Sequence, residues 1–128
     1  MIDNPAKLPE IDVVEVVNLC RVDVYDVSNY MQNVGNSEFI RLSGNSAQKI
    51  AELWRKLPEG MSARCHFPPY GFRFYKDEKL ILQGSVCWQC NNIYGDVNGD
   101  EFAYRFNGED QISQELLSIC KSLCFINR

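Results

Sequence analysis

The chain lacks several features that mark common classes of protein. It has a single histidine, His66, the residue most often used for acid–base chemistry near neutral pH. It has no apolar run close to the roughly 20 residues that cross a bilayer. Residues 1–17 lack the basic start, apolar run and small-residue cleavage site of a secretory signal. We therefore expect a cytoplasmic protein with no membrane segment, in which the six cysteines stay reduced and form no disulfides.

Positive charge is also scarce. The 13 Lys and Arg residues are outnumbered by 17 Asp and Glu residues, which gives a net charge of −4 and a pI near 5.0. A nucleic-acid-binding protein usually carries a basic patch, and here the basic residues are scattered among acids. Nucleic acid is therefore not an expected partner. A protein with a basic surface fits this charge better.

The apolar content is sufficient for one hydrophobic core. With 128 residues, of which 45% are hydrophobic, the chain is expected to form a single domain over residues 1–128. Residues 1–10 carry two prolines and read as an irregular lead-in. Turn signals and alternation predict six strands, in segments 12–27, 38–42, 63–67, 71–75, 79–87 and 101–106.

Two segments have the spacing of amphipathic helices. The first follows Asn45 and Ser46, either of which could cap it, and stops at Pro58 and Gly60. The second closes the chain, with one apolar stripe made of Ile112, Leu116, Ile119, Cys120, Leu123 and Cys124. Gly84 predicts a β-bulge, and Asn98-Gly99 predicts a hairpin turn. The order of the elements predicts an α+β fold, an antiparallel β-meander with two helices packed on one face.

The strongest candidates for chemistry are Cys65, His66, Cys87 and Cys90. A C-x2-C pair supplies two zinc ligands from one tight turn. However, Cys65 and His66 are adjacent, and adjacent side chains of an extended strand point to opposite faces. In a plain meander, a whole strand would also separate Cys65 from Cys87. Zinc at these four residues is therefore the alternative, and a packing role for the cysteines is favoured.

Thiol redox chemistry is a further interpretation of Cys87-Trp88-Gln89-Cys90. A reactive C-x2-C usually lies at a helix N-terminus, whereas residues 91–99 read as loop and turn. Cysteine–histidine catalysis would need His66 beside a thiol and a third group to orient the imidazole, and no feature of the sequence supplies that group. No enzymatic activity is expected.

Charged and aromatic residues of the strands and turns are candidates for partner contacts. Asp96, Asn98 and Asp100 imitate the start of a calcium loop, but Glu101 stands where that loop requires glycine, and a hairpin turn explains these residues better. Strand alternation places Arg73 on the face opposite Phe72 and Phe74. The expected contact residues are Asp96, Asp100, Glu101, Arg73 and Tyr75, with Asp23 and Asp26 as further acids.

Residues 65–75 read C-H-F-P-P-Y-G-F-R-F-Y, and residues 87–92 read C-W-Q-C-N-N. These two runs resemble a family of small uncharacterised bacterial proteins with the pattern C-H-x-P-P-x-G-x-R-F-Y followed by C-W-x-C-N-N. The resemblance covers roughly residues 50 to 106. It implies a grouping and no activity, cofactor or catalytic residue.

Two functional hypotheses follow from the sequence. The first is a non-catalytic protein that binds a protein partner, by analogy with small acidic immunity proteins that neutralise a cognate toxin or effector. The second, the alternative, is a small zinc-binding or thiol-redox protein that uses Cys65, Cys87 and Cys90 with His66 nearby.

Overall fold

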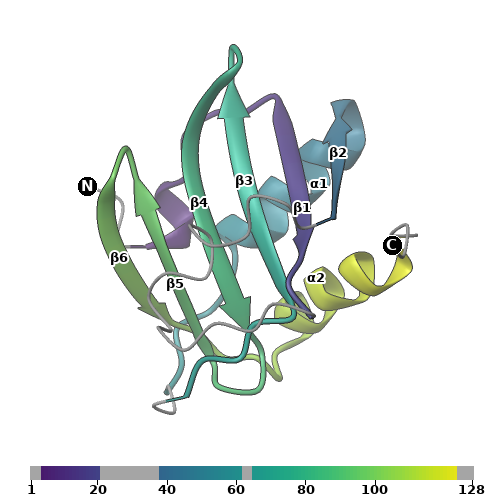
Figure 1. Ribbon diagram of the computed structural model, residues 1–128. Helices are drawn as coiled ribbons and strands as arrows, with labels where there is room; N and C mark the ends of the chain where they lie inside the picture. Colours follow the sequence, from purple (N-terminus) through teal and green to yellow (C-terminus); the bar gives the residue numbers. More distant parts are fainter. Residues whose placement is uncertain (1–3, 21–37, 62–64, 124–128) are drawn as a thin grey trace.

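The computed structural model describes residues 4–20, 38–61 and 65–123. They form one six-stranded antiparallel sheet with strand order β2-β1-β3-β4-β5-β6 and two α-helices behind it (Figure 1). The predicted α+β fold with helices packed on a sheet is confirmed. The elements are a 3-10 helix Pro5–Lys7, β1 Val13–Asn18, β2 Phe39–Ser43, α1 Gly44–Arg55, β3 Tyr70–Lys76, β4 Lys79–Cys87, β5 Asn92–Val97, β6 Asp100–Arg105 and α2 Gln111–Ser122.

The sheet is a meander only over its last four strands. β3, β4, β5 and β6 pair in sequence order, whereas β1 lies between β2 and β3. The chain leaves β2 at one edge of the sheet, and α1 then crosses behind the middle strands before the chain enters β3 (Figure 1). The Asn98-Gly99 turn that joins β5 and β6 was predicted correctly, and both of its residues have positive φ.

Two segments differ from the sequence prediction. The strand predicted over residues 63–67 does not form: residues 65–69, which include the proline pair, are irregular, and residues 62–64 lie outside the described residues. Residues 92–97, which read as loop and turn, form β5 with partners on both sides. Pairing with two neighbours overrides the weak strand propensity of asparagine and glycine. The predicted strand beyond Cys20, with Asp23 and Asp26, also lies outside the described residues.

The N-cap of α1 and the role of Gly84 also differ from the sequence prediction. α1 begins at Gly44, so neither Asn45 nor Ser46 is its N-cap. The register shift expected at Gly84 occurs instead between Phe74 and Tyr75. A Cβ at Gly84 would lie 3.5 Å from Cη2 of Trp54 and 3.2 Å from Cγ2 of Ile93. The glycine is therefore explained by the close approach of α1 to the sheet.

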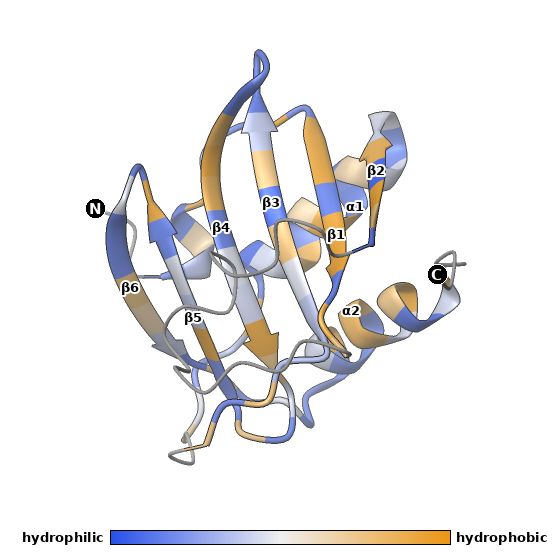
Figure 2. Ribbon diagram, viewed as in Figure 1, coloured by the Kyte–Doolittle hydropathy of each residue, from blue (hydrophilic) through white to orange (hydrophobic). Residues whose placement is uncertain are grey.

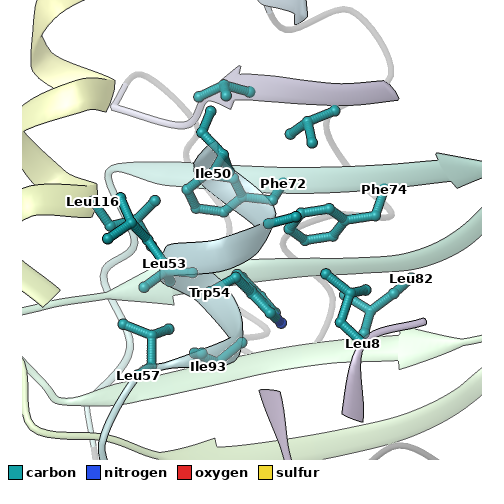
Figure 3. Close-up of a cluster of buried hydrophobic side chains, with 14 of the residues drawn as sticks. Leu8, Ile50, Leu53, Trp54, Leu57, Phe72, Phe74, Leu82, Ile93 and Leu116 are labelled. Atoms are coloured by element: carbon teal, nitrogen blue, oxygen red, sulfur yellow. The ribbon is translucent and has the colours of Figure 1, made fainter. Parts of the chain in front are cut away.

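Trp54 is the centre of the layer between α1 and the sheet (Figure 3). Its side chain is fully buried and makes edge-to-face contacts with Phe72 and Phe74 at centroid distances of 5.5 and 4.9 Å. Leu116 and Cys120 place α2 in the same core, as the predicted apolar stripe requires. Along β3 and α2, hydrophobic and hydrophilic residues follow one another, as expected for elements with one buried side (Figure 2).

Replacing Trp54 with alanine is expected to lower the free energy of unfolding by about 3–5 kcal/mol, because the change opens a cavity and removes both aromatic contacts. Urea unfolding of the purified variant measures this value. Met61→Ala is the control, since Met61 is 87% exposed and its loss should change stability by less than about 0.5 kcal/mol. Equal effects of the two changes would contradict this account of the core.

Candidate functional site

The face of the sheet opposite the helices, here called the outer face, carries two groups of polar residues. The first lies where the irregular segment 65–69 crosses β4 and β5. His66 is 0% exposed, and its ring packs against the ring of Tyr94 in a tilted arrangement, with 4.2 Å between the ring centroids. Its two ring nitrogens contact Ser85 of β4 and Asn92 of β5, so the segment is held to the sheet by side chains rather than by strand pairing.

Cys65 and Cys90 form a disulfide, with their Cα atoms 5.7 Å apart. The prediction that all six cysteines are reduced is therefore wrong. The separation of Cys65 from the C-x2-C loop by a whole strand is also wrong, because Cys65 is not in a strand and lies beside the loop between β4 and β5. Sequence periodicity could not show this, since the contact joins residues 25 apart.

The zinc interpretation of Cys65, His66, Cys87 and Cys90 does not fit this geometry. Cys65 and Cys90 are bonded to each other, which leaves neither sulfur as a thiolate ligand. Both nitrogens of His66 already have hydrogen-bond partners. No group of three His, Cys, Asp or Glu residues suited to a metal occurs in the part of the chain that the structure describes.

The hydrogen bonds around His66 determine its tautomer. The Nδ2 of Asn92 donates to the carbonyl of Cys65 at 2.8 Å, so its Oδ1 faces the Nδ1 of His66 at 2.6 Å. Nδ1 therefore carries the proton, and Nε2 accepts from the Ser85 hydroxyl at 2.7 Å. Burial lowers the pKa of His66 from 6.5 to about 4, against the opposing effect of the bond to Asn92. The imidazole is thus neutral at physiological pH.

Ser85, His66 and Asn92 stand in the relation of hydroxyl, base and orienting group that nucleophilic enzymes use. The orienting group that the sequence did not reveal is Asn92, 26 residues from His66. Ser85 is only 1% exposed, however, and His66 covers it, so a substrate carbonyl cannot approach the hydroxyl. The Ser85 hydroxyl also lies 3.2 Å from the carbonyl of Tyr94. As it stands, this group satisfies buried polar atoms and holds the segment 65–69 in place.

The second polar group is a row that crosses all six strands of the outer face. Each member is the register partner of the next, in the order Arg41, Glu15, Arg73, Gln83, Asp96 and Glu101. We call this set the cross-strand row. Its signs run from a mixed basic and acidic half on β2, β1 and β3 to an acidic end on β5 and β6. Cross-strand neighbours on one face interact directly, so the row is one continuous strip of charged and polar side chains, with the neutral Gln83 between its two halves.

Glu15 lies at the centre of the half of the cross-strand row on β2, β1 and β3. Its carboxylate accepts from Arg41 at 2.9 Å, from Arg73 at 3.5 Å and from the Tyr75 hydroxyl at 2.7 Å. Burial raises the pKa of Tyr75 to about 12, and the hydrogen bond to Glu15 acts in the same direction. Sequence reasoning missed Glu15, although one acid in the run Val-Val-Glu-Val-Val is a visible signal.

The structure places four of the five predicted contact residues on the outer face and Asp100 on the helix face. Arg73, Asp96 and Glu101 belong to the cross-strand row, and Tyr75 lies beside it on the same face. Asp100 pairs with Val97, and alternation places both side chains on the helix face. The five candidates therefore do not form one patch, and Asp100 is separated from the other four.

Asp96 and Glu101 face each other directly across β5 and β6. The carbonyl of Arg105 in β6 accepts from Gly60 and so points away from β5, which makes Arg105 and Asn92 a non-hydrogen-bonded pair. Glu101 lies four residues before Arg105 in the same strand, so Asp96 and Glu101 are a pair of the same type, in which the side chains are closest. Asp96 accepts from Gln83 at 3.0 Å. Within the described residues, no ion pair joins either acid to a basic side chain. A hollow beside them is lined by Tyr94, Gly95, Glu101, Phe102 and Ala103.

Comparisons with protein-family models, curated proteins and solved structures found no match for this chain. The resemblance to small bacterial proteins over residues 50–106 therefore stays a prediction. No helix among the described residues is long and apolar enough to cross a membrane.

The buried neutral His66 predicts a loss of stability in weak acid. In the unfolded chain the histidine pKa returns to about 6.5, so the unfolded state binds the extra proton between pH 6.5 and 4. Stability due to this group is present above pH 6.5 and falls as pH approaches 4. We expect a loss of about 2 kcal/mol between pH 7 and pH 5, measured by urea unfolding.

His66→Gln is the matched control for this pH dependence. Glutamine can occupy the same polar pocket and does not titrate, so the variant should lose this share of the pH dependence and keep only the share due to carboxylates. An identical slope in the wild type and the variant would show that His66 is not the group responsible.

Proposed function

We propose that this chain is a non-catalytic protein that binds a protein partner through its outer face. The observation that carries the proposal is the pair Asp96 and Glu101, two acids placed opposite each other that form no ion pair with a basic side chain among the described residues. Like charges directly opposite each other destabilise a sheet by a few tenths of a kcal/mol to about 1 kcal/mol. A lysine or arginine of a partner would neutralise both carboxylates and remove that cost.

The surroundings of the acid pair support a basic side chain as the occupant. The adjacent hollow is lined by Tyr94 and Ala103 beside Glu101, all three of which alternation places on the outer face. Such a surface can receive the apolar stem of a lysine or arginine while its charged head meets Glu101. The net charge of −4 favours the approach of a basic partner over long range.

The other half of the cross-strand row offers side chains of the types that dominate protein interfaces. Phe39 is 50% exposed, and the Arg41 side chain is 49% exposed. The guanidinium groups of Arg73 and Arg41 lie 6.0 and 5.3 Å from the ring centroids of Phe39 and Tyr75, which restrains these side chains before binding. Arginine and aromatic residues held in place contribute strongly to binding, because little entropy is lost when the complex forms.

Within this proposal, the partner is a toxin or effector that the chain neutralises by occupying a basic functional surface. Immunity proteins of this size and charge act in that way, and the analogy rests on the acidic pair and the lack of an accessible catalytic group among the described residues. We also propose a cytoplasmic location. Three of the five described cysteines, Cys20, Cys87 and Cys120, are free thiols, which suits a reducing compartment.

One observation favours a second candidate, a thiol-redox protein. Cys65 and Cys90 are paired, and a free thiol of the same C-x2-C sequence, Cys87, lies next to Cys90. In the cytosol, a disulfide is usually transient and takes part in redox chemistry. This candidate does not depend on the acid pair.

The double variant Asp96→Asn and Glu101→Gln tests the partner-binding proposal through two opposite effects. It should raise the free energy of unfolding by about 0.5 kcal/mol, because repulsion is removed from the free protein. It should weaken partner binding at least about tenfold, which corresponds to ~1.4 kcal/mol. Calorimetry with the partner that co-purifies with the tagged wild-type chain measures the affinity, and urea unfolding measures the stability.

Asp100→Asn is the matched control, since it removes one acid from the same hairpin on the opposite face. It should leave the affinity unchanged. Failure of the wild-type chain to bind any protein at submicromolar strength, or equal binding by the wild type and the double variant, would overturn the proposal. Recovery of the partner's own activity with the double variant, and its inhibition by the wild type, would identify the complex as neutralising.

A further inference from the structure

We propose that Cys65, Cys87 and Cys90 form a thiol–disulfide exchange site, in which Cys87 attacks Cys90 and releases Cys65. The inference rests on the thiol-redox candidate described above and is independent of partner binding. Three cysteines meet at the loop between β4 and β5, where two are bonded and the third is a free thiol. The spacing of the cysteines in the sequence did not predict that Cys65 lies at this loop.

The loop geometry brings Cys87 within reach of Cys90. Cys87 pairs with Asn92, so only residues 88–91 lie between the two strands. The Sγ of Cys87 accepts a hydrogen bond from the backbone N–H of Cys90 at 3.2 Å. Residues three apart in a tight turn have Cα atoms less than about 7 Å apart, which overlaps the range of about 4.4–6.8 Å found in disulfides. A Cys87–Cys90 disulfide therefore needs only a local adjustment.

Neighbouring contacts hold this loop in place. The indole N–H of Trp88 donates to the carbonyl of Ser113 at 2.8 Å, which ties the loop to the start of α2. The Oδ1 of Asn91 accepts from the backbone N–H of Gly108 at 3.0 Å. Because both ends of the loop are anchored, Cys87 and Cys90 stay close whether or not Cys65 is attached.

The exchange is balanced without an external oxidant or reductant. The Cys87 thiol loses its proton, and its sulfur forms a bond to the Sγ of Cys90. The bond between Cys90 and Cys65 breaks, and the sulfur of Cys65 leaves as a thiolate and takes up one proton. One disulfide and one thiol are present before and after the step, so no net oxidation or reduction takes place.

Exposure gives the two states different reactivity. Cys87 and Cys90 are buried, whereas Cys65 is only half-buried. In the state with Cys65 paired, the free thiol Cys87 is hidden from solvent. After exchange, the free thiol is the half-exposed one, Cys65. The site thus converts a protected thiol into one that small thiol compounds or disulfides, such as those of the glutathione class, can reach.

The exchange also changes how the segment 65–69 is attached. With Cys65 bonded to Cys90, the segment is covalently fixed to the loop and cannot leave the sheet. After exchange, only non-covalent contacts hold it. They include the two hydrogen bonds of His66, the bond from Asn92 to the Cys65 carbonyl, and the bond from the backbone N–H of Leu19 to the Pro69 carbonyl. Ser85, which His66 covers, would become accessible when these bonds open.

The test is alkylation of the native full-length chain with iodoacetamide at pH 8, without reductant. Alkylation of the released Cys65 traps the exchanged state. Tryptic digestion without reduction then separates peptide 65–73 from peptide 80–105, which contains both Cys87 and Cys90. We expect alkylated 65–73 to accumulate together with 80–105 that carries an internal disulfide, as measured by mass spectrometry.

Cys87→Ser removes the attacking thiol and should slow the labelling of Cys65 at least about tenfold, with the two peptides remaining linked; Cys87→Ala is the second variant if serine disturbs folding. Cys120→Ser is the control, since Cys120 is buried in α2 and burial raises its thiol pKa to about 12. In this variant, iodoacetamide should label Cys65 at the same rate as in the wild type.

Three other results would overturn the exchange site. If the wild type keeps the peptides linked and Cys65 unlabelled, the disulfide is static and the exchange does not occur. If Cys87→Ser labels Cys65 at the wild-type rate, Cys87 is not the attacking thiol. If Cys65 and Cys90 are both labelled from the start, the disulfide is absent and the thiol-redox candidate fails with it. None of these results bears on Asp96 or Glu101, so the partner-binding proposal is tested separately.

Discussion

The packing of Trp54 between α1 and the sheet is the contact on which the rest of the structure depends. It uses one face of β3 and β4, with Phe72 and Phe74 around the indole and Gly84 beneath it. Because strand side chains alternate, burying these residues places Arg73 and Gln83 on the other face. The outer face and its charged row are thus a direct consequence of the core.

Two buried polar side chains on the outer face, His66 and Glu15, are each satisfied by different partners. At one side His66 is fully buried, and every ring nitrogen has a partner in Ser85 or Asn92, so its neutral form is stable there. At the other side Arg41, Arg73 and Tyr75 all donate hydrogen bonds to the carboxylate of Glu15. Asp96 and Glu101 differ from both, since Asp96 is partly buried, Glu101 is exposed, and neither forms an ion pair among the described residues. The indole N–H of Trp54 is a buried donor with no hydrogen-bond partner, so satisfaction of buried polar atoms is not complete in the described residues.

The parts of the fold that could be predicted are those with local signals. The helical spacing around Trp54, the alternation of Phe72 and Phe74, and the Asn98-Gly99 turn each predict an element within one window of sequence. β5 could not be predicted, because its asparagine and glycine residues have low strand propensity and its stability comes from β4 and β6. The irregular path of residues 65–69 was missed for the converse reason. Its strand-like residues have no neighbouring strand to pair with, and side-chain bonds to Ser85 and Asn92 hold it instead.

The fold class, the apolar stripes of both helices and the acidic balance follow from the sequence alone, because they depend on composition and on periods of two to about four residues. The sequence also identified Cys65, His66, Cys87 and Cys90 as candidates for a chemical site. Only the tertiary structure decided what that group is. The pairing of Cys65 with Cys90, the hydrogen bonds that join His66 with Ser85 and Asn92, and the alignment of six charged or polar residues into one row all join positions far apart in the chain. Such contacts depend on strand order and register, which are set by packing across the whole sheet and which no local window of sequence contains.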